Sequence, residues 1–329
     1  MNKMFTIARN TFTETLRQPV YAIIITTALF LFFISPSLTM YTMSDDNKLL
    51  RELGLSTLFL TSLFIAIFSA SGAVAEEMEN KTITTVLSKP VRRPIFILAK
   101  FLGVVSAVAL AHYICTVALL MAIRHGVLET VNDTHDWTVI STAAAVVGGA
   151  FLLSAFFNYV YDWKFSSTTM VLGGIFATLG LIFLCFIDRN WQFNPQENGI
   201  NALDVYGSIL LLLAAIIIVA LALAFSARFN IAVTLSACIG IFLLGLVSDY
   251  TFGKLAETEL LWARFWANMG RFLVPNLQIF WISDAIYEGS EVPFKEFTQY
   301  FVRAASYALC YTTAILALAV AVFQRRQVG

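Results

Sequence analysis

Charged residues are scarce in this sequence. Only 13% of its 329 residues are Asp, Glu, Lys or Arg, about half the share found in soluble proteins. Hydrophobic residues make up 59% of the chain, and the mean hydropathy is +0.78, which places the chain among helical membrane proteins. The formal net charge is +0 with no basic tail or stripe, so nucleic acid is disfavoured as a partner.

The sequence also lacks the motifs of common catalytic and metal sites. It has three histidines and neither an H-E-x-x-H nor a G-x-S-x-G pattern, which disfavours a zinc or serine hydrolase. Its four cysteines form no C-x-x-C pair and lie inside apolar runs, as small buried hydrophobic residues do. No G-x-x-x-x-G-K-[ST] loop for binding ATP is present. We therefore expect no catalytic residue, no metal ligand and no cofactor in this chain.

Long apolar runs predict the fold. About 20 apolar residues are needed to cross the hydrocarbon core of a bilayer, and eight runs meet this requirement: 20–43, 54–75, 95–123, 138–160, 168–187, 207–226, 231–249 and 301–323. None of the six tryptophans falls in mid-span, as expected for side chains that prefer the membrane interface. The sequence therefore predicts an all-α, polytopic helical membrane protein with about eight spans, forming a single transmembrane domain over residues 1–329.

An amphipathic stretch precedes the first span. Between Lys3 and Arg17, apolar residues recur at every fourth position and polar residues lie on another side: Met4, Ala8, Phe12 and Leu16 against Arg9, Thr13 and Arg17. This spacing predicts a helix over residues 1–18 that lies in the membrane interface. A solvated helix in an N-terminal tail is the alternative.

The most polar stretch lies between the second and third spans. It runs from Glu76 to Arg93, EEMENKTITTVLSKPVRR, with seven charged residues in eighteen. Thr82 can cap a short helix over Ile83–Ser88, and Pro90 ends it by disfavouring helix at the preceding residue. We predict that residues 76–94, the polar segment, present a short cytoplasmic helix to a partner. An ordinary charged turn is the alternative, although turns between helices are more often two to eight residues long.

Residues 250–300 could be mistaken for a ninth span. Arg271 and Asp284 would each be costly inside the membrane, and Pro275, Asn276 and Gln278 add to that cost. We predict a re-entrant or interfacial helical hairpin on the outer side, with a plain extracellular loop as the alternative. With eight spans and both termini cytoplasmic, twelve Lys and Arg residues lie inside and nine outside, and the inner loops are shorter. This distribution favours that orientation.

Polar residues within the predicted spans are few. His112 lies near the middle of the third span, where we expect a hydrogen bond between helices, with a proton relay or a substrate contact as the alternative. Asn158 is expected to hydrogen-bond between helices, and Lys100 to reach the cytoplasmic surface. Two glycine pairs, Gly148-Gly149 and Gly173-Gly174, predict close helix packing, with a hinge as the alternative.

Several of these stretches resemble a known family. The N-terminal IARNTFTETLRQPVY, the loop AEEMENKTITTVLSKPVRRPIFILAKFLG, the outer PNLQIFWISDA and the closing FQRRQVG are similar to the type-two (export-type) ABC transporter permease family. The resemblance implies the membrane-spanning permease subunit of an ATP-driven exporter in the cell (inner) membrane. A second permease copy, or a related permease, would help to enclose the substrate pathway. ATP and Mg would bind to a separate cytosolic ATP-binding cassette ATPase, so that the chain itself would not be an enzyme.

The same resemblance implies roles for individual residues. The N-terminal helix would be the elbow helix, with Arg9, Phe12 and Arg17, and Ile83–Ser88 would be the coupling helix that seats on the ATPase. The coupling residues would be Glu76, Glu77, Lys81, Thr82, Leu87, Lys89, Pro90, Arg92 and Arg93. The chain departs from the family's usual six spans by two. A self-sufficient secondary transporter or channel, or a non-transporting membrane scaffold, are the alternative functions.

Overall fold

A computed structural model of the chain describes residues 3–39, 46–79, 92–128, 134–195, 199–257, 260–282 and 294–325. Of these residues, 88% are helical and none forms a β-strand, so the all-α prediction is confirmed. The helices are α1 (Lys3–Arg17), α2 (Pro19–Leu38), α3 (Asp46–Glu79), α5 (Arg93–His125), α6 (Trp137–Tyr161), α7 (Phe165–Phe186), α8 (Ala202–Ser226), α9 (Ile231–Ala256), α10 (Leu261–Leu273) and α12 (Phe294–Arg325), with the 3₁₀ turn η3 (Gln278–Phe280).

Eight of these helices are long and apolar enough to cross a membrane, which confirms the predicted number of spans. The second span begins earlier than expected, at Asp46 instead of residue 54. The added turns contain Arg51, whose Nε lies 3.3 Å from a carboxylate oxygen of Asp204 in α8. Because this charge has a partner, the helix continues through residues that hydropathy alone assigns to a loop.

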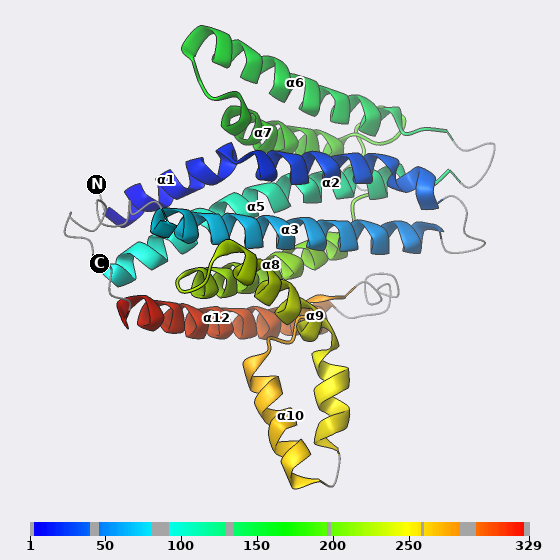
Figure 1. Ribbon diagram of the computed structural model, residues 1–329. Helices are drawn as coiled ribbons and strands as arrows, with labels where there is room; N and C mark the ends of the chain where they lie inside the picture. Colours follow the sequence, from blue (N-terminus) through cyan, green and yellow to red (C-terminus); the bar gives the residue numbers. More distant parts are fainter. Residues whose placement is uncertain are drawn as a thin grey trace.

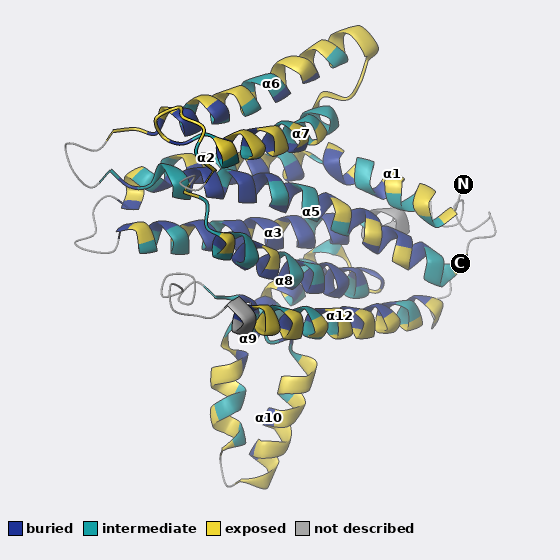
Figure 2. Cartoon of the chain, turned by 180° about the vertical axis from the view of Figure 1, so that it is seen from behind, coloured by how far each residue is buried: buried dark blue, intermediate teal, exposed yellow. Residues whose placement is uncertain are grey.

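The long helices lie side by side and end on two faces of the bundle (Figure 1). The terminal face carries both chain termini, the end of α3 and the start of α5, and the opposite face carries the end of α5 and the starts of α6 and α8. Helices α3, α5 and α8 form a core trio, with 67%, 56% and 72% of their most apolar windows buried. Helices α6 and α7 form a peripheral pair with mostly exposed faces (Figure 2).

The glycine pairs in α6 and α7 differ in their surroundings. A β-carbon on Gly149 would lie 3.3 Å from the ring of Phe176, and one on Gly174 would lie 2.8 Å from Leu110. These two glycines therefore allow close packing, as predicted. In contrast, Gly148 has no neighbouring heavy atom within 4 Å of such a β-carbon, so helix packing does not account for it.

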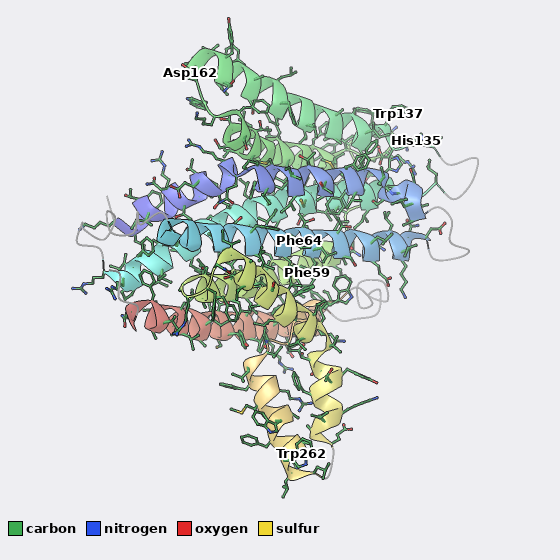
Figure 3. The ribbon with its side chains drawn as sticks, in the orientation of Figure 1. Phe59, Phe64, His135, Trp137, Asp162 and Trp262 are labelled. Atoms are coloured by element: carbon green, nitrogen blue, oxygen red, sulfur yellow. The ribbon has the colours of Figure 1, made fainter. Side chains whose placement is uncertain are left out.

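The first part of α9 packs against the core, where Cys238 and Phe242 are buried. Its later part and α10 form a helical hairpin that projects from the bundle with Trp262 near its tip (Figures 1 and 3). Within residues 250–300, α10 and η3 are helical, and a position on the outer side of the membrane stays a prediction. The end of α10 and the chain that follows it, including η3, lie beside α12, where three tyrosine hydroxyls bond to backbone groups: Tyr311 to the Leu273 carbonyl at 2.7 Å, Tyr307 from the Asn276 N–H at 2.9 Å and Tyr300 to the Ile279 carbonyl at 2.5 Å. Irregular backbone beside a membrane span requires such partners.

Candidate functional site

The first part of the candidate site is the contact between α1 and α5 on the terminal face. Gly103 of α5 allows this approach, because a β-carbon there would lie 2.6 Å from the Ala8 carbonyl oxygen. Lys100, one turn earlier, is covered by α1 and does not extend freely to the surface as expected. Its side chain is 3% exposed, and its ammonium nitrogen lies 3.8 Å from a carboxylate oxygen of Glu14. Helix α1 is thus held to α5 by close packing and an ion pair.

The three residues assigned to the elbow helix lie on different sides of α1. Phe12 is half-buried and packs against the main hydrophobic core, whereas Arg9 and Arg17 are exposed. Leu16 is buried, and its carbonyl oxygen accepts a hydrogen bond from the Ser166 hydroxyl at the start of α7. The apolar side of α1 therefore faces the bundle, and its arginines remain accessible on the terminal face.

The second part is the start of α5, immediately after the polar segment. The Arg93 guanidinium donates a 2.7 Å hydrogen bond to the Gln324 carbonyl near the end of α12, where a positive charge complements the helix dipole. One turn later, the Phe96 ring stacks on Phe323 of α12 at 5.8 Å between centroids. Arg92, by contrast, is exposed. The structure therefore separates two neighbouring arginines that the resemblance treats alike.

Most of the predicted coupling residues lie outside the described residues. These are Lys81, Thr82, Leu87, Lys89 and Pro90, together with the predicted helix Ile83–Ser88. Glu76 and Glu77 belong to the last turns of α3, but their side chains are also outside the described part. The structure does show that the segment joins α3 to α5, two helices of 34 and 33 residues that reach the opposite face.

The third part is a buried polar node within the core trio. The His112 Nε2 lies 2.9 Å from the Ser208 carbonyl oxygen of α8, and its Nδ1 lies 2.7 Å from the Ser62 hydroxyl of α3. A carbonyl oxygen only accepts, so Nε2 carries a proton, and in a neutral ring Nδ1 accepts from Ser62. Thr116 also bonds to the Ser208 hydroxyl at 2.6 Å. His112 on α5 thus hydrogen-bonds to both α3 and α8, and its use as a proton relay or a substrate contact stays a prediction.

Asn158 does not hydrogen-bond between helices as predicted. Its amide nitrogen donates to the Trp163 carbonyl at 2.5 Å, and the chain between them turns through Asp162 in a left-handed conformation with φ of 55°. Asp162 lies at the end of α6 in Figure 3. The prediction was wrong because the end of α6 leaves its last carbonyl groups without helical partners, and Asn158 closes the turn that follows.

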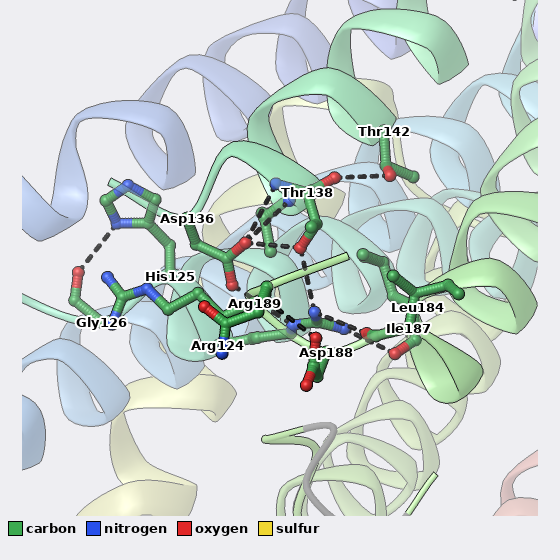
Figure 4. A network of polar contacts seen from close by, with 12 residues as sticks. Arg124, His125, Gly126, Asp136, Thr138, Thr142, Leu184, Ile187, Asp188 and Arg189 are labelled. Atoms are coloured by element: carbon green, nitrogen blue, oxygen red, sulfur yellow. Dashed lines mark hydrogen bonds and ion pairs between the residues drawn. The ribbon is translucent and has the colours of Figure 1, made fainter. Parts of the chain in front are cut away.

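A second polar network, which the sequence analysis did not find, lies on the opposite face (Figure 4). The Arg124 guanidinium at the end of α5 lies 3.4 Å from a carboxylate oxygen of Asp136 and donates to the Leu184 and Ile187 carbonyls of the α7 end at 2.5 and 2.8 Å. Asp136 also caps α6 by accepting from two backbone N–H groups. The arginine and aspartate side chains are 4% and 2% exposed. This network joins the core trio to the peripheral pair.

The described residues contain no group of three or more His, Cys, Asp or Glu side chains placed to hold a metal ion. Comparison with protein-family models finds a match to an ABC-2 family transporter protein over residues 16–228, more than half of the chain's 329 residues. This match runs from the end of α1 to the turn after α8, so it includes the polar segment, the core trio and the peripheral pair. A search of curated proteins finds no match.

Proposed function

This chain belongs to the ABC-2 family of transporter membrane proteins, and from that premise we propose that it is the permease subunit of an exporter driven by a separate ATPase. The partner would be a cytosolic ATP-binding cassette subunit that binds ATP and Mg. A second permease copy, or a related permease, would complete the substrate pathway. Both termini, and with them the terminal face, would be cytoplasmic in the cell (inner) membrane, in line with the distribution of Lys and Arg.

The observation that carries this proposal is the position of the polar segment. It connects the end of α3 to the start of α5, and both helices continue through the core trio to the opposite face. Packed helices shift as rigid units, so a partner that moves the segment would move these two helices. The polar node at His112 lies between these two helices and α8. A movement of α3 or α5 relative to α8 would therefore change its hydrogen bonds.

The contacts at the start of α5 refine which residues would meet the ATPase. Arg93 is engaged by the end of α12, so we assign it to holding the permease together. Arg92 is exposed at the boundary of the polar segment, so we assign it to the ATPase contact. The stacked rings of Phe96 and Phe323 would make the first turn of α5 move together with α12.

The test is copurification of the permease with a candidate ATP-binding cassette subunit encoded beside it. We expect the permease alone to hydrolyse no ATP, and Arg92→Glu to weaken ATPase binding about tenfold or more while leaving membrane insertion intact. Arg228→Glu is the matched control, because Arg228 is exposed in the turn after α8 on the same face. Unchanged ATPase binding by Arg92→Glu would contradict the assigned contact.

The orientation has a separate test. Cysteines would be introduced at Arg228, on the terminal face, and at Trp191, on the opposite face, after replacement of the four native cysteines. A membrane-impermeant maleimide added to intact cells should label the cysteine at position 191 and spare the one at position 228. The reverse pattern would place the polar segment outside the cell, where no ATPase could reach it.

A further inference from the structure

Two of the three histidines meet on the opposite face of the bundle. His125 is the last residue of α5, and His135 comes immediately before Asp136, the cap of α6. The His125 Nε2 and the His135 Nδ1 lie 3.4 Å apart, with ring centroids separated by 5.5 Å. Figure 3 places His135 beside Trp137 at this end of the molecule, and Figure 4 shows His125 beside the Arg124 network.

The distance between the two nitrogens is long for a hydrogen bond and equals the spacing of two ligands on one metal ion. An N–H group usually lies about 2.9–3.0 Å from its acceptor, and 3.4 Å is well beyond that value. Two imidazole nitrogens on a tetrahedral zinc ion, each about 2.0–2.1 Å from the metal, are about 3.3–3.4 Å apart. The histidine pair is therefore spaced as two ligands of one ion would be.

The proton on His125 is also placed as a metal site requires. Its Nδ1 lies 3.0 Å from the Gly126 carbonyl oxygen, which only accepts, so Nδ1 carries a proton. In the neutral ring, Nε2 then keeps its lone pair and faces His135. Histidines that bind metals commonly donate their other ring N–H to a backbone carbonyl in this way, which fixes the orientation of the ring.

The surroundings hold both rings in place. Arg124, next to His125, is paired with Asp136, next to His135, so the pair of neighbouring charges is balanced. Arg189 donates to the carbonyl of Thr134 and so holds the chain on the other side of His135. The Trp137 ring meets His135 edge-on at 6.3 Å between centroids. A bound cation would therefore meet a supported site.

We propose that His125 and His135 bind one divalent transition-metal ion of the zinc class, with water completing its coordination. Imidazole suits Zn²⁺, Cu²⁺ and Ni²⁺, and the spacing favours a tetrahedral ion. This site revises the expectation of no metal ligand in the chain, and it does not depend on the transport proposal. A bound ion would link the end of α5 to the start of α6, and so the core trio to the peripheral pair.

The experiment uses the full chain, purified in detergent through an affinity tag that contains no histidine. Co²⁺ titration should give the visible absorption bands of a tetrahedral site, one ion per chain, and Zn²⁺ should displace the cobalt. His125→Asn and His135→Asn should each weaken Co²⁺ binding about tenfold or more. Trp137→Phe is the matched control, because it keeps both imidazoles and an aromatic ring beside His135, and its cobalt affinity should match that of the natural chain.

A second measurement keeps the test valid if a variant is less stable. Zn²⁺ should raise the melting temperature of the natural chain and of Trp137→Phe, because a ligand that binds only the folded state stabilises it. The same Zn²⁺ concentration should leave the melting temperatures of both histidine variants unchanged. Failure of the natural chain to bind Co²⁺ or Zn²⁺, or equal affinity in the histidine variants, would overturn the proposal.

Discussion

The core trio and the peripheral pair contain helices of the same hydropathy that differ in what surrounds them. The most apolar windows of α3 and α6 have the same mean hydropathy of 2.0, yet 67% of the first and 22% of the second are buried within the chain. Hydropathy therefore identifies membrane spans without telling which of them pack at the centre. The position of polar side chains is more informative, because in the trio they bond from helix to helix at mid-span.

The two regions are also held in different ways. The trio packs along its length, and small side chains in α8 such as Ala214 and Ala222 are fully buried, which allows neighbouring helices to approach closely. The peripheral pair meets α5 through a smaller apolar cluster that includes Val117, Met121 and Leu184. Polar bonds fix its ends: the Arg124 network on the opposite face and, at the start of α7, the bond from Ser166 to the Leu16 carbonyl of α1. We infer that the pair can be loosened from the trio by changes at these ends.

The largest expected effect is at Arg124. Arg124→Leu removes the partner of a buried carboxylate and two bonds to α7 carbonyls, and the free energy of unfolding should fall by about 3–5 kcal/mol, as for other broken buried ion pairs. The measurement is unfolding in a titration with sodium dodecyl sulfate. An impermeant thiol reagent should also reach a cysteine placed at Thr142 of α6, which is buried in the natural chain.

The control for this prediction restores the balance of charge. In Arg124→Leu/Asp136→Asn no unpaired carboxylate remains, while the side chain at 136 still caps α6, so the double variant should be more stable than Arg124→Leu alone. If the double variant is instead the less stable of the two, the loss does not come from an unpaired charge, and the network is not the joint between the regions.

The next effect compares two glycines. Gly103→Ala places a methyl group 2.6 Å from the Ala8 carbonyl oxygen, so α1 must move away from α5, and we expect a loss of about 1–3 kcal/mol from overpacking. Gly148→Ala in the peripheral pair meets no atom within 4 Å and should raise stability by up to about 1 kcal/mol, because Ala favours helix. The same detergent titration measures both. Equal losses would mean that the two regions are packed alike.

A smaller effect is expected at the polar node. His112→Leu removes the bonds to Ser62 and Ser208. The remaining hydroxyls on the trio can then bond to one another or to carbonyls of their own helices, because the Ser62 hydroxyl lies 2.9 Å from the Leu58 carbonyl oxygen and Thr116 already donates to the His112 carbonyl. Interhelical hydrogen bonds in membranes contribute about 0.6 kcal/mol on average and up to about 1.7, so we expect a loss of about 1–2 kcal/mol. An unchanged unfolding midpoint in the detergent titration would show that packing alone holds the trio together.

The sequence predicts what depends on local pattern. The eight spans follow from long apolar runs, and the amphipathic α1 follows from a period near four. The hairpin follows from charges and from Pro275 in an otherwise apolar run. Each of these features depends on the residue pattern of one continuous stretch of chain, so neighbouring residues are enough to predict it.

Features that join distant stretches were not predicted. Arg51 and Asp204 are 153 positions apart in sequence. Taken alone, each charged residue would be assigned to a loop outside the membrane. Asp136 followed by Thr138 does carry a helix-cap signal, but nothing in that signal points to Arg124. The three tyrosines of α12 share a helical face at spacings of seven and four, a usable signal, although it does not say which backbone they meet. Which distant residues pair depends on how the helices pack against one another, and the pattern of a single sequence does not show that packing.

The smallest effect tests the attachment of the peripheral pair along its length. The Tyr113 hydroxyl of α5 donates to the Thr178 hydroxyl of α7 at 2.9 Å, one of the described polar bonds between the two regions that does not lie at a helix end. Because the site is exposed, and Thr178 also bonds to the Gly174 carbonyl, Tyr113→Phe should cost only about 0.5 kcal/mol. In the detergent titration this variant should unfold near the natural midpoint, far from Arg124→Leu. A loss as large as that of Arg124→Leu would show that the pair is held along its whole length, and the distinction between a packed trio and an end-attached pair would fail.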